Sequence, residues 1–306
     1  MTKRKYSILK VNVSKHKLED IAKFISPFQN DDRSLVGNLG YSFAEIENQL
    51  KEYMNKQPQS FFQVAQDDAG EIRGFFGVIF SDPHTLRLFG PYVTDIENEW
   101  KEISETFFKK ILERYKRWKG IKLRVAFTPK NKLLKRFYET HGFVQYNAER
   151  TMVLKRQEWQ RKRSEIDVLS NDSVDIRSYR DTDFADFLNI HPQGAYFNAH
   201  DIVQNLNDLH HLMMAVLDNR IVGYVYYEEF EADGLTDICF LNVLPSAQNR
   251  QIGTKLIEKA IEDSFQKSKI KKIEISVCVD NTAAFRLYQR LGFKETTTYL
   301  AYELKF

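Results

Sequence analysis

The chain has 306 residues, of which 42% are hydrophobic and 28% are charged, and its net charge at pH 7 is +3. This length suits two domains of about 150 residues better than one, and no apolar run approaches the roughly 20 residues of a membrane span. No apolar stretch follows the charged N-terminus, so we expect a cytoplasmic protein without a secretory signal or a membrane partner. The small net charge gives no reason to expect a nucleic acid partner.

The N-terminal half alternates between strand and helix patterns. Period-two alternation predicts strands, and helical periodicity predicts helices. The predicted strands lie at residues 6–11, 61–66, 72–80 and 85–93, and the predicted helices at 17–24, 43–54 and 98–118. A strand before Asn131, a helix after it and a closing strand at 151–154 complete this half.

The C-terminal half shows the same kinds of element. The predicted strands lie at residues 174–178, 211–217, 221–228 and 235–244, and the predicted helices at 182–189, 201–206 and 251–265. The polar stretch 156–173 is typical of a linker, which predicts domains at 1–155 and 174–306. Cys239 and Cys278 lie in apolar stretches, where reduced thiols are the usual case.

Two segments of the chain resemble each other at a constant offset. Residues 131–143 (NKLLKRFYETHGF) match residues 281–293 (NTAAFRLYQRLGF) in their Asn, Arg, Tyr, Gly and Phe positions. The same offset of 150 aligns the strands before these helices and the closing strands, 151–154 with 301–304. The chain is therefore predicted to hold two copies of one fold, each an α/β (mixed α+β) domain with a central mixed sheet.

The stretch 241–256 combines a strand end, a polar loop and a helix start. Pro245 ends the strand, and Gly253 lies in the first turn of an amphipathic helix. Such a loop points backbone N–H groups outward, and the helix dipole adds positive charge, so that it can bind a pyrophosphate. Arg250 and Lys255 could supplement it. A plain strand–loop–helix connection is the alternative.

Together, these stretches resemble the GNAT N-acetyltransferase superfamily. The family's pyrophosphate motif, Q/R-x-x-G-x-G/A, is similar to residues 248–253 (QNRQIG), and its second signature, N-x-x-A-x-x-L-Y-x-x-L-G-F, is similar to residues 281–293. The resemblance implies two tandem GNAT-like domains, each with a mixed, mostly antiparallel sheet flanked by helices. Gln251 stands where the first motif has glycine, and a side chain there crowds the approach of a phosphate to the backbone.

The resemblance also implies acetyl-CoA as co-substrate, no metal, and roles for the matched residues. The N–H groups of Leu241 and Val243 would face the pantetheine and the acetyl carbonyl, Asn281 would contact the pantetheine arm, and Tyr288 would protonate the departing thiolate. A packed core aromatic is the alternative for Tyr288. The residues implied to bind the donor are Leu241, Val243, Gln248, Asn249, Arg250, Gln251, Ile252, Gly253, Thr254, Asn281 and Ala284.

A base must remove a proton from the incoming ammonium, and Asp237 occupies the place of a carboxylate that some members carry. It alternates with Leu241 and Val243, so we expect it to face the same side of the sheet. A surface carboxylate is the alternative, and Glu228 or Glu229 could serve instead.

The remaining candidates lie on the acceptor side and among the histidines. His191, Tyr196 and Phe197 lie between the first two helices of the C-terminal half, in a region that often borders the acceptor in this family, and they join Glu228 as candidate substrate-binding residues. The neighbouring His210 and His211 would point to opposite faces of a strand, which argues against a shared metal.

The N-terminal half lacks the pyrophosphate motif. No glycine follows Gly90 at the corresponding place, and Asp95, Glu97 and Glu99 crowd the helix start, where they would repel a pyrophosphate. We interpret this half as a degenerate copy that braces the active one.

The sequence thus predicts an acetyl-CoA-dependent N-acyltransferase for a small-molecule or peptide amine, acting as a monomer or homodimer. One alternative is a non-catalytic acyl-CoA-binding regulatory protein, which would bind CoA without turnover. Another is an aminoacyl-tRNA-dependent transferase, which would need a basic surface and no CoA loop. The loop at residues 248–253 argues against it.

Overall fold

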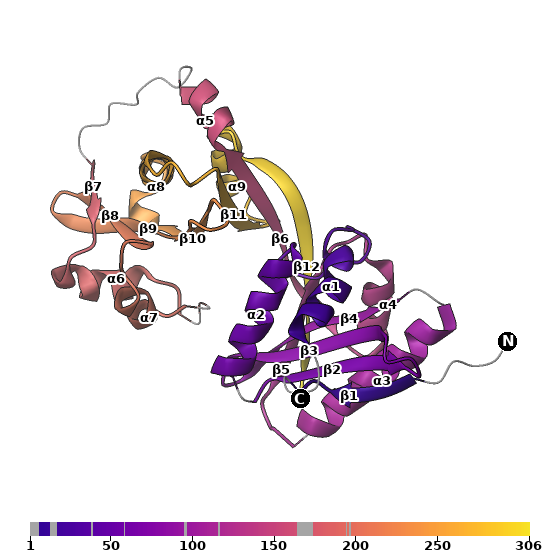
Figure 1. Cartoon of the computed structure of the whole chain (residues 1–306). Coiled ribbons are helices and arrows are strands. Elements are labelled where there is room, and N and C mark those ends of the chain that lie inside the picture. The colour runs from indigo at the N-terminus through magenta and orange to yellow at the C-terminus, as the bar shows by residue number, and fades with distance from the viewer. Residues whose placement is uncertain are drawn as a thin grey trace. The chain divides into compact units, whose positions relative to one another are not determined.

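The computed structural model describes residues 6–12, 17–37, 39–57, 59–94, 97–115, 117–163, 174–193, 195 and 197–306, with only the backbone of Lys56, Glu97 and Asn98. The chain forms two compact units. Unit 1 consists of Met1–Ala148 and Thr298–Phe306, and unit 2 of Glu149–Thr297. Each unit is an α/β fold around a mostly antiparallel sheet (Figure 1), so the predicted pair of α/β domains is confirmed.

Unit 1 orders its strands β1-β2-β3-β4-β5-β12, and β4 and β5 are its parallel pair. Its strands are β1 (Tyr6–Lys10), β2 (Phe61–Asp67), β3 (Ile72–Asp82), β4 (Thr85–Val93), β5 (Lys122–Phe127) and the end of β12 (Lys294–Lys305). Its helices are α1 (Leu18–Gln29), α2 (Phe43–Lys56), α3 (Glu97–Tyr115) and α4 (Lys132–Thr140). Ser42 begins α2 with a capping box, in which its hydroxyl accepts from Glu45 N and the Glu45 carboxylate accepts from Ser42 N.

Unit 2 orders its strands β6-β11-β10-β9-β8-β7, and β10 and β11 are its parallel pair. Its strands are β6 (Val144–Lys155), β7 (Val174–Ser178), β8 (His210–Leu217), β9 (Arg220–Phe230), β10 (Leu235–Val243) and β11 (Lys272–Cys278). Its helices are α5 (Arg156–Arg163), α6 (Phe184–Ile190), α7 (Ala199–Gln204), α8 (Ile252–Gln266) and α9 (Thr282–Arg290). Helix α8 covers one face of this sheet, and α6 and α7 cover the other, each over its own apolar core (Figure 1).

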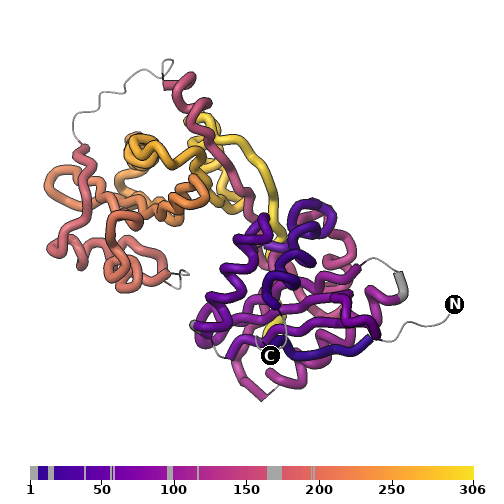
Figure 2. The backbone as a smooth tube through the Cα atoms, in the orientation of Figure 1, coloured from indigo at the N-terminus to yellow at the C-terminus, as the bar shows by residue number. Residues whose placement is uncertain are grey.

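Strands β6 and β12 each run from one unit into the other. Residues 149–155 of β6 pair with β11 in unit 2, and residues 300–305 of β12 pair with β5 in unit 1. Figure 2 shows the yellow C-terminal strand entering the indigo and purple N-terminal unit. Each sheet is therefore completed by a strand that begins in the other unit, whereas the sequence led us to place a boundary after residue 155.

The segment expected to be a linker begins with a helix. Residues 156–163 form α5, because Trp159 is buried and the Arg156 guanidinium is held by backbone carbonyl groups. Residues 164–173 lie outside the described residues.

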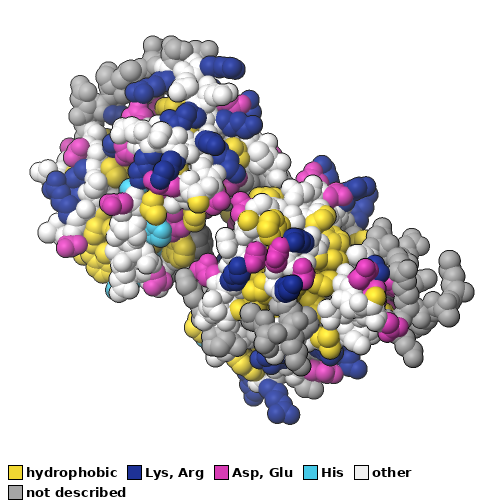
Figure 3. Space-filling view, in the orientation of Figure 1, with side chains coloured by type: hydrophobic (Ala, Val, Ile, Leu, Met, Phe, Trp, Pro, Cys, Tyr) yellow, Lys and Arg dark blue, Asp and Glu magenta, His cyan; other side chains and the backbone are white. Residues whose placement is uncertain are grey.

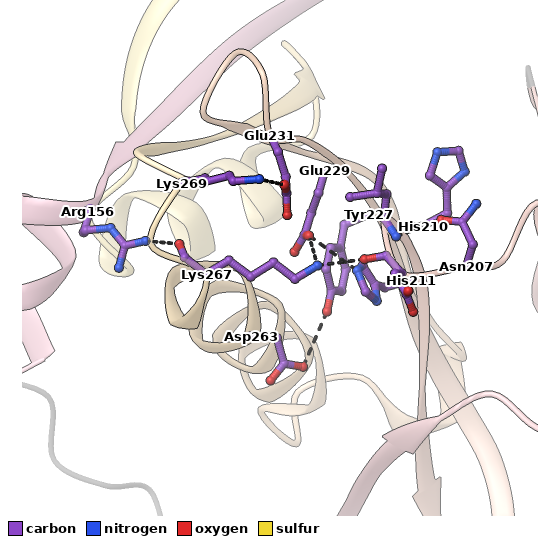
Figure 4. Close-up of polar contacts among 12 residues, drawn as sticks. Arg156, Asn207, His210, His211, Tyr227, Glu229, Glu231, Asp263, Lys267 and Lys269 are labelled. Atoms are coloured by element: carbon purple, nitrogen blue, oxygen red, sulfur yellow. Dashed lines mark hydrogen bonds and ion pairs between the residues drawn. The ribbon is translucent and has the colours of Figure 1, made fainter.

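Polar contacts fix the C-terminal end of α8 (Figure 4). The Arg156 guanidinium donates to the carbonyl oxygen atoms of Lys267 at 2.5 Å and Ile270 at 2.6 Å. The Lys267 ammonium forms an ion pair with the buried carboxylate of Glu229 and donates to the carbonyl oxygen of Asp208 at 2.7 Å. A buried carboxylate is stable only when it is paired and hydrogen-bonded, so these contacts hold α8 in one position on the sheet.

Candidate active site

A groove in unit 2 brings the predicted donor-binding residues together, with the exception of Arg250. Its volume is about 580 Å³, and no acidic residue lines it within the described part of the chain. Its walls are Leu241, Asn242, Val243, Ala247, Gln248, Asn249, Gln251, Ile252, Gly253, Thr254, Asn281, Ala283, Ala284, Arg286, Leu287 and Arg290. Arg250 is exposed and lies outside this lining.

One wall is the open edge of β10. This strand pairs with β11 only over Leu235–Ile238, whereas it stays paired with β9 as far as Val243. Past Ile238, the backbone groups of β10 that face β11 have no strand beside them. Leu241 and Val243 lie on this stretch and line the groove.

The second wall is the N-terminal end of α8. The first intrahelical bond is donated by Lys255 N to Gln251 O at 3.0 Å, so the N–H groups of Ile252, Gly253 and Thr254 precede it. The side chain of the N-cap residue, Gln251, makes no capping hydrogen bond within the described part of the chain, and no acidic residue lies in the first turn. The end is therefore suited to an anion.

The loop before α8 has two residues in the left-handed region. Asn249 and Gln251 both have φ of 61°. Asparagine tolerates this conformation, but for glutamine it costs on the order of 1 kcal/mol. The family motif has glycine at this position, and glycine adopts this conformation without the cost. Gln251 therefore keeps the loop conformation at the expense of backbone strain.

The third wall is α9, which begins at Asn281. The Asn281 side chain accepts a hydrogen bond from Ala284 N at 3.1 Å, and Asn131 does the same for Leu134 N at 3.1 Å in unit 1. The repeated asparagine is thus a helix N-cap in both units. In unit 2 it also lines the groove.

Tyr288 and its counterpart Tyr138 are both buried on the equivalent helices. The Tyr138 hydroxyl donates to the carbonyl oxygen of Gly90 on β4 at 2.6 Å. The Tyr288 hydroxyl forms no hydrogen bond with any described residue, and its oxygen atom is not fully buried. Burial raises the pKa of the Tyr288 phenol, so it stays protonated at neutral pH.

A β-bulge separates Asp237 from the groove residues of its own strand. The register of β10 against β9 shifts between Ile238 and Phe240. Leu241 and Val243 pack in the core under α8, whereas Phe240 packs with α6 and α7. The expectation that Asp237 shares a face with Leu241 and Val243 is wrong, because the extra residue of the bulge reverses the alternation.

Asp237 lies in a row of carboxylates on the face covered by α6 and α7. It stands opposite Glu228 on β9 and Glu274 on β11. Burial, followed by the charges of Glu274 and Glu228, raises the pKa of Asp237 to about 7. A carboxyl group with this pKa can accept a proton near neutral pH, as a general base must.

The two candidate alternatives to Asp237 lie on opposite faces of β9. Glu228 is half-buried and accepts a hydrogen bond from the Tyr226 hydroxyl at 2.7 Å. Glu229 is buried on the α8 face and paired with Lys267, so it is not available to an acceptor on the Asp237 side.

The candidates between α6 and α7 are held by internal contacts. His191 is buried, with Nδ1 2.7 Å from the Tyr224 hydroxyl and Nε2 2.8 Å from the carbonyl oxygen of Phe197. Both ring nitrogens are engaged, so His191 shapes this wall and offers no free nitrogen to a ligand. The half-buried Phe197 packs against the same core, and Tyr196 lies outside the described residues.

Unit 1 has a groove of about 430 Å³ at the equivalent place, but its chemistry differs. Pro91 stands at the position of Leu241 and has no N–H to donate. Helix α3 begins at Glu97, whereas the repeat would place its start at residue 102. Residues 98–101, the counterparts of the end of the loop before α8, are therefore part of the helix. The buried Ile103 replaces Gly253, and Tyr138 uses its hydroxyl on Gly90. The alignment of the two halves already places Pro91 opposite Leu241, so this difference could have been predicted from the sequence.

Comparisons with known proteins show what this chain is similar to. Residues 175–293 match the model of the acetyltransferase (GNAT) family. A mycothiol acetyltransferase of Brachybacterium faecium is 26% identical over 130 residues, which cover 40% of this chain and 36% of that protein.

Two solved structures share the fold over nearly the whole chain. A GCN5-related N-acetyltransferase from Sphaerobacter thermophilus has a TM-score of 0.70 and 15% identity, over 98% of this chain and 95% of that one. A tandem GNAT protein from the clavulanic acid biosynthesis pathway has a TM-score of 0.68 and 12% identity, over 98% of both chains. The C-terminal unit therefore belongs to the acetyltransferase (GNAT) family, and the chain as a whole has the tandem GNAT fold.

Proposed function

We propose that unit 2 transfers the acetyl group of acetyl-CoA to an amine of a small molecule or peptide. The observation that carries this proposal is one groove bounded by the open edge of β10, the uncapped N-terminus of α8 and α9. The groove fits an anionic, extended donor because Leu241 and Val243 give it apolar surface along β10, its described lining has no carboxylate, and unpaired backbone N–H groups lie close by. The family match covers the same unit.

The donor would lie with its diphosphate at Gly253 and Thr254 and its pantetheine arm along β10. Leu241 and Val243 lie on the open edge of that strand, where backbone N–H groups can pair with the arm or with the acetyl carbonyl. The Gln248 side chain folds back onto the carbonyl oxygen of Val243 at 3.1 Å and holds the end of the strand.

The chemistry then needs one base and one acid. Asp237 would take a proton from the acceptor ammonium, so that the amine nitrogen can form a bond to the acetyl carbon as the carbon–sulfur bond breaks. Tyr288 would give its proton to the departing thiolate. The raised pKa of Asp237 and the absence of a protein partner for the Tyr288 hydroxyl within the described residues support these assignments.

The acceptor side favours a cationic amine. Glu228 and Glu274 flank Asp237 on neighbouring strands. Among the described residues, the one ion pair to these three carboxylates is the contact of 3.5 Å between Lys272 and Glu274. Such a surface raises the local concentration of cations. An acceptor that arrives as an ammonium would meet its base within this row.

The direct test is to incubate the full chain with acetyl-CoA and a panel of amines, and to measure both thiol release and the acetylated product by mass spectrometry. We expect amine-dependent release of CoA. Tight CoA binding without turnover over a broad panel would favour the regulatory alternative. The tRNA-dependent alternative requires a basic surface, and the face shown in Figure 3 intersperses Lys and Arg with Asp and Glu side chains.

A further inference from the structure

Two arginines that the motifs did not single out also line the groove. Arg286 and Arg290 are one helical turn apart on α9, and both line the groove together with Ala283 and Leu287. Both side chains are exposed, and neither takes part in an ion pair or hydrogen bond with any residue that the structure describes. Their charges are therefore available to a ligand.

These arginines line the same groove as the first residues of α8. The groove thus offers two separate features that attract anions, the N–H groups of Gly253 and Thr254 and the guanidinium pair. A diphosphate at the helix start would occupy one of them. A donor that carries an additional phosphate would use both.

The groove of the N-terminal copy shares residues at the start of the helix, but the described lining does not include the counterparts of the arginine pair. Its groove is lined by Asn131, Leu133 and Leu134, the counterparts of Asn281, Ala283 and Ala284. The counterparts of the arginine pair are Arg136 and Thr140, and neither lines it. The arginine pair therefore lines the groove of the unit that also keeps the loop before α8.

We propose that Arg286 and Arg290 form a phosphate monoester subsite, which takes the 3′-phosphate on the ribose of CoA and makes unit 2 selective for donors that carry this group. A guanidinium pair suits a phosphate monoester, because each fork can donate two hydrogen bonds to its oxygen atoms. The inference rests on the proposed function, since it places the donor in this groove.

The test is a calorimetric titration of the full chain with CoA and with dephospho-CoA, which lacks only the 3′-phosphate. We expect wild type to bind CoA about 10- to 100-fold more tightly. In R286Q and R290Q the affinity for CoA should fall toward that for dephospho-CoA, whose own affinity should change less than about twofold. R136Q, at the same place in unit 1, should leave both affinities unchanged.

Equal binding of the two ligands by wild type would overturn the subsite and leave the proposed function standing. A parallel loss for both ligands in R286Q and R290Q would also overturn it, because the arginines would then act on a group common to both. Failure of wild type to bind either ligand would overturn the proposed function as well.

Discussion

The hydroxyl of Tyr138 donates a 2.6 Å hydrogen bond to the carbonyl oxygen of Gly90, across the open edge of the strand that corresponds to β10. The repeat relates Tyr138 to Tyr288 and Gly90 to Phe240. In unit 1 this contact ties α4 to β4, whereas the Tyr288 hydroxyl has no such bond among the described residues. The same side chain thus ties a helix to a strand in one unit and has no such bond among the described residues of the other.

The first prediction concerns Y288F. It should lower kcat by about 10- to 1,000-fold, because it removes the proton donor to the thiolate. Stability and CoA affinity should stay close to wild type, because the hydroxyl makes no internal hydrogen bond within the described part of the protein. Steady-state kinetics and thermal unfolding check both. An unchanged kcat at saturating substrates would remove Tyr288 from the mechanism.

The matched control is Y138F, for which we expect the reverse. It leaves the Gly90 carbonyl without its donor, which should cost about 1–2 kcal/mol of unfolding free energy. The kcat should stay within about twofold of wild type. A large loss of kcat in a folded Y138F protein would show that unit 1 takes part in the chemistry.

The second prediction is a pH dependence set by Asp237. With its pKa raised to about 7, the base is protonated and inactive in acid, so kcat/KM should rise with pH through about 7. D237N should be slow and should lose this limb of the profile. If D237N keeps the limb, another group is the base.

Asp237 also affects stability with a defined sign. Its pKa in the folded state lies above the unfolded value of 3.8, so folding favours the protonated carboxyl group. The contribution of this group to the free energy of unfolding is therefore lost as the pH rises from about 4 through about 7. D237N should therefore gain on the order of 1 kcal/mol over wild type at pH 8, and this advantage should vanish near pH 4. Denaturant titrations at the two pH values measure the difference.

The third prediction is that Q251G relieves strain in the loop before α8. Glycine adopts the φ of 61° found at Gln251 without steric cost, so the unfolding free energy should rise by roughly 0.5–1 kcal/mol. CoA should bind at least as tightly. T254G is the control, because Thr254 is helical and glycine there should lower stability by a similar amount. Destabilisation by both variants would contradict the strained geometry.

The fourth prediction follows from the exchanged strands. Tyr302 is buried in unit 1 and stacks on Phe127 with ring centroids 5.1 Å apart. Y302A, near the C-terminus, should therefore destabilise the N-terminal unit by about 3 kcal/mol. Hydrogen exchange should become faster in β2–β5, while the amides of β8–β10 and CoA binding are preserved. Faster exchange confined to β8–β10 would contradict the exchange of strands.

The repeat made the fold predictable, but not which strands pair. Residues 151–154 and 301–304 align in the two copies, so either segment could complete either sheet as far as local pattern is concerned. The choice depends on long-range pairing, β6 with β11 and β12 with β5, which no local pattern records. Strand periodicity therefore placed a domain boundary after residue 155, where the structure has β6 leading directly into α5.

The candidate site shows the same limit. The donor-binding residues that the family motifs mark, with the exception of Arg250, line one groove, because the motifs cover one loop and the helices beside it. The face of Asp237 was missed because a single bulge residue near Cys239 reverses the alternation. Arg286 and Arg290 could have been found from their helical spacing, since they lie one turn apart on the face that carries Ala283.

The central claim is that the chain binds one CoA, in unit 2, and calorimetric titration with CoA tests it most directly. Wild type should give a stoichiometry near one. G253A should still bind, because a Cβ at this position would lie 3.5 Å from Leu287, an ordinary contact. G253E should abolish binding, since a carboxylate close to a diphosphate opposes it by roughly 1 kcal/mol or more while also filling the groove. The same titration of E99A, in unit 1, should match wild type. A stoichiometry of two, or binding that survives in folded G253E, would contradict the division into one donor-binding unit and one degenerate unit.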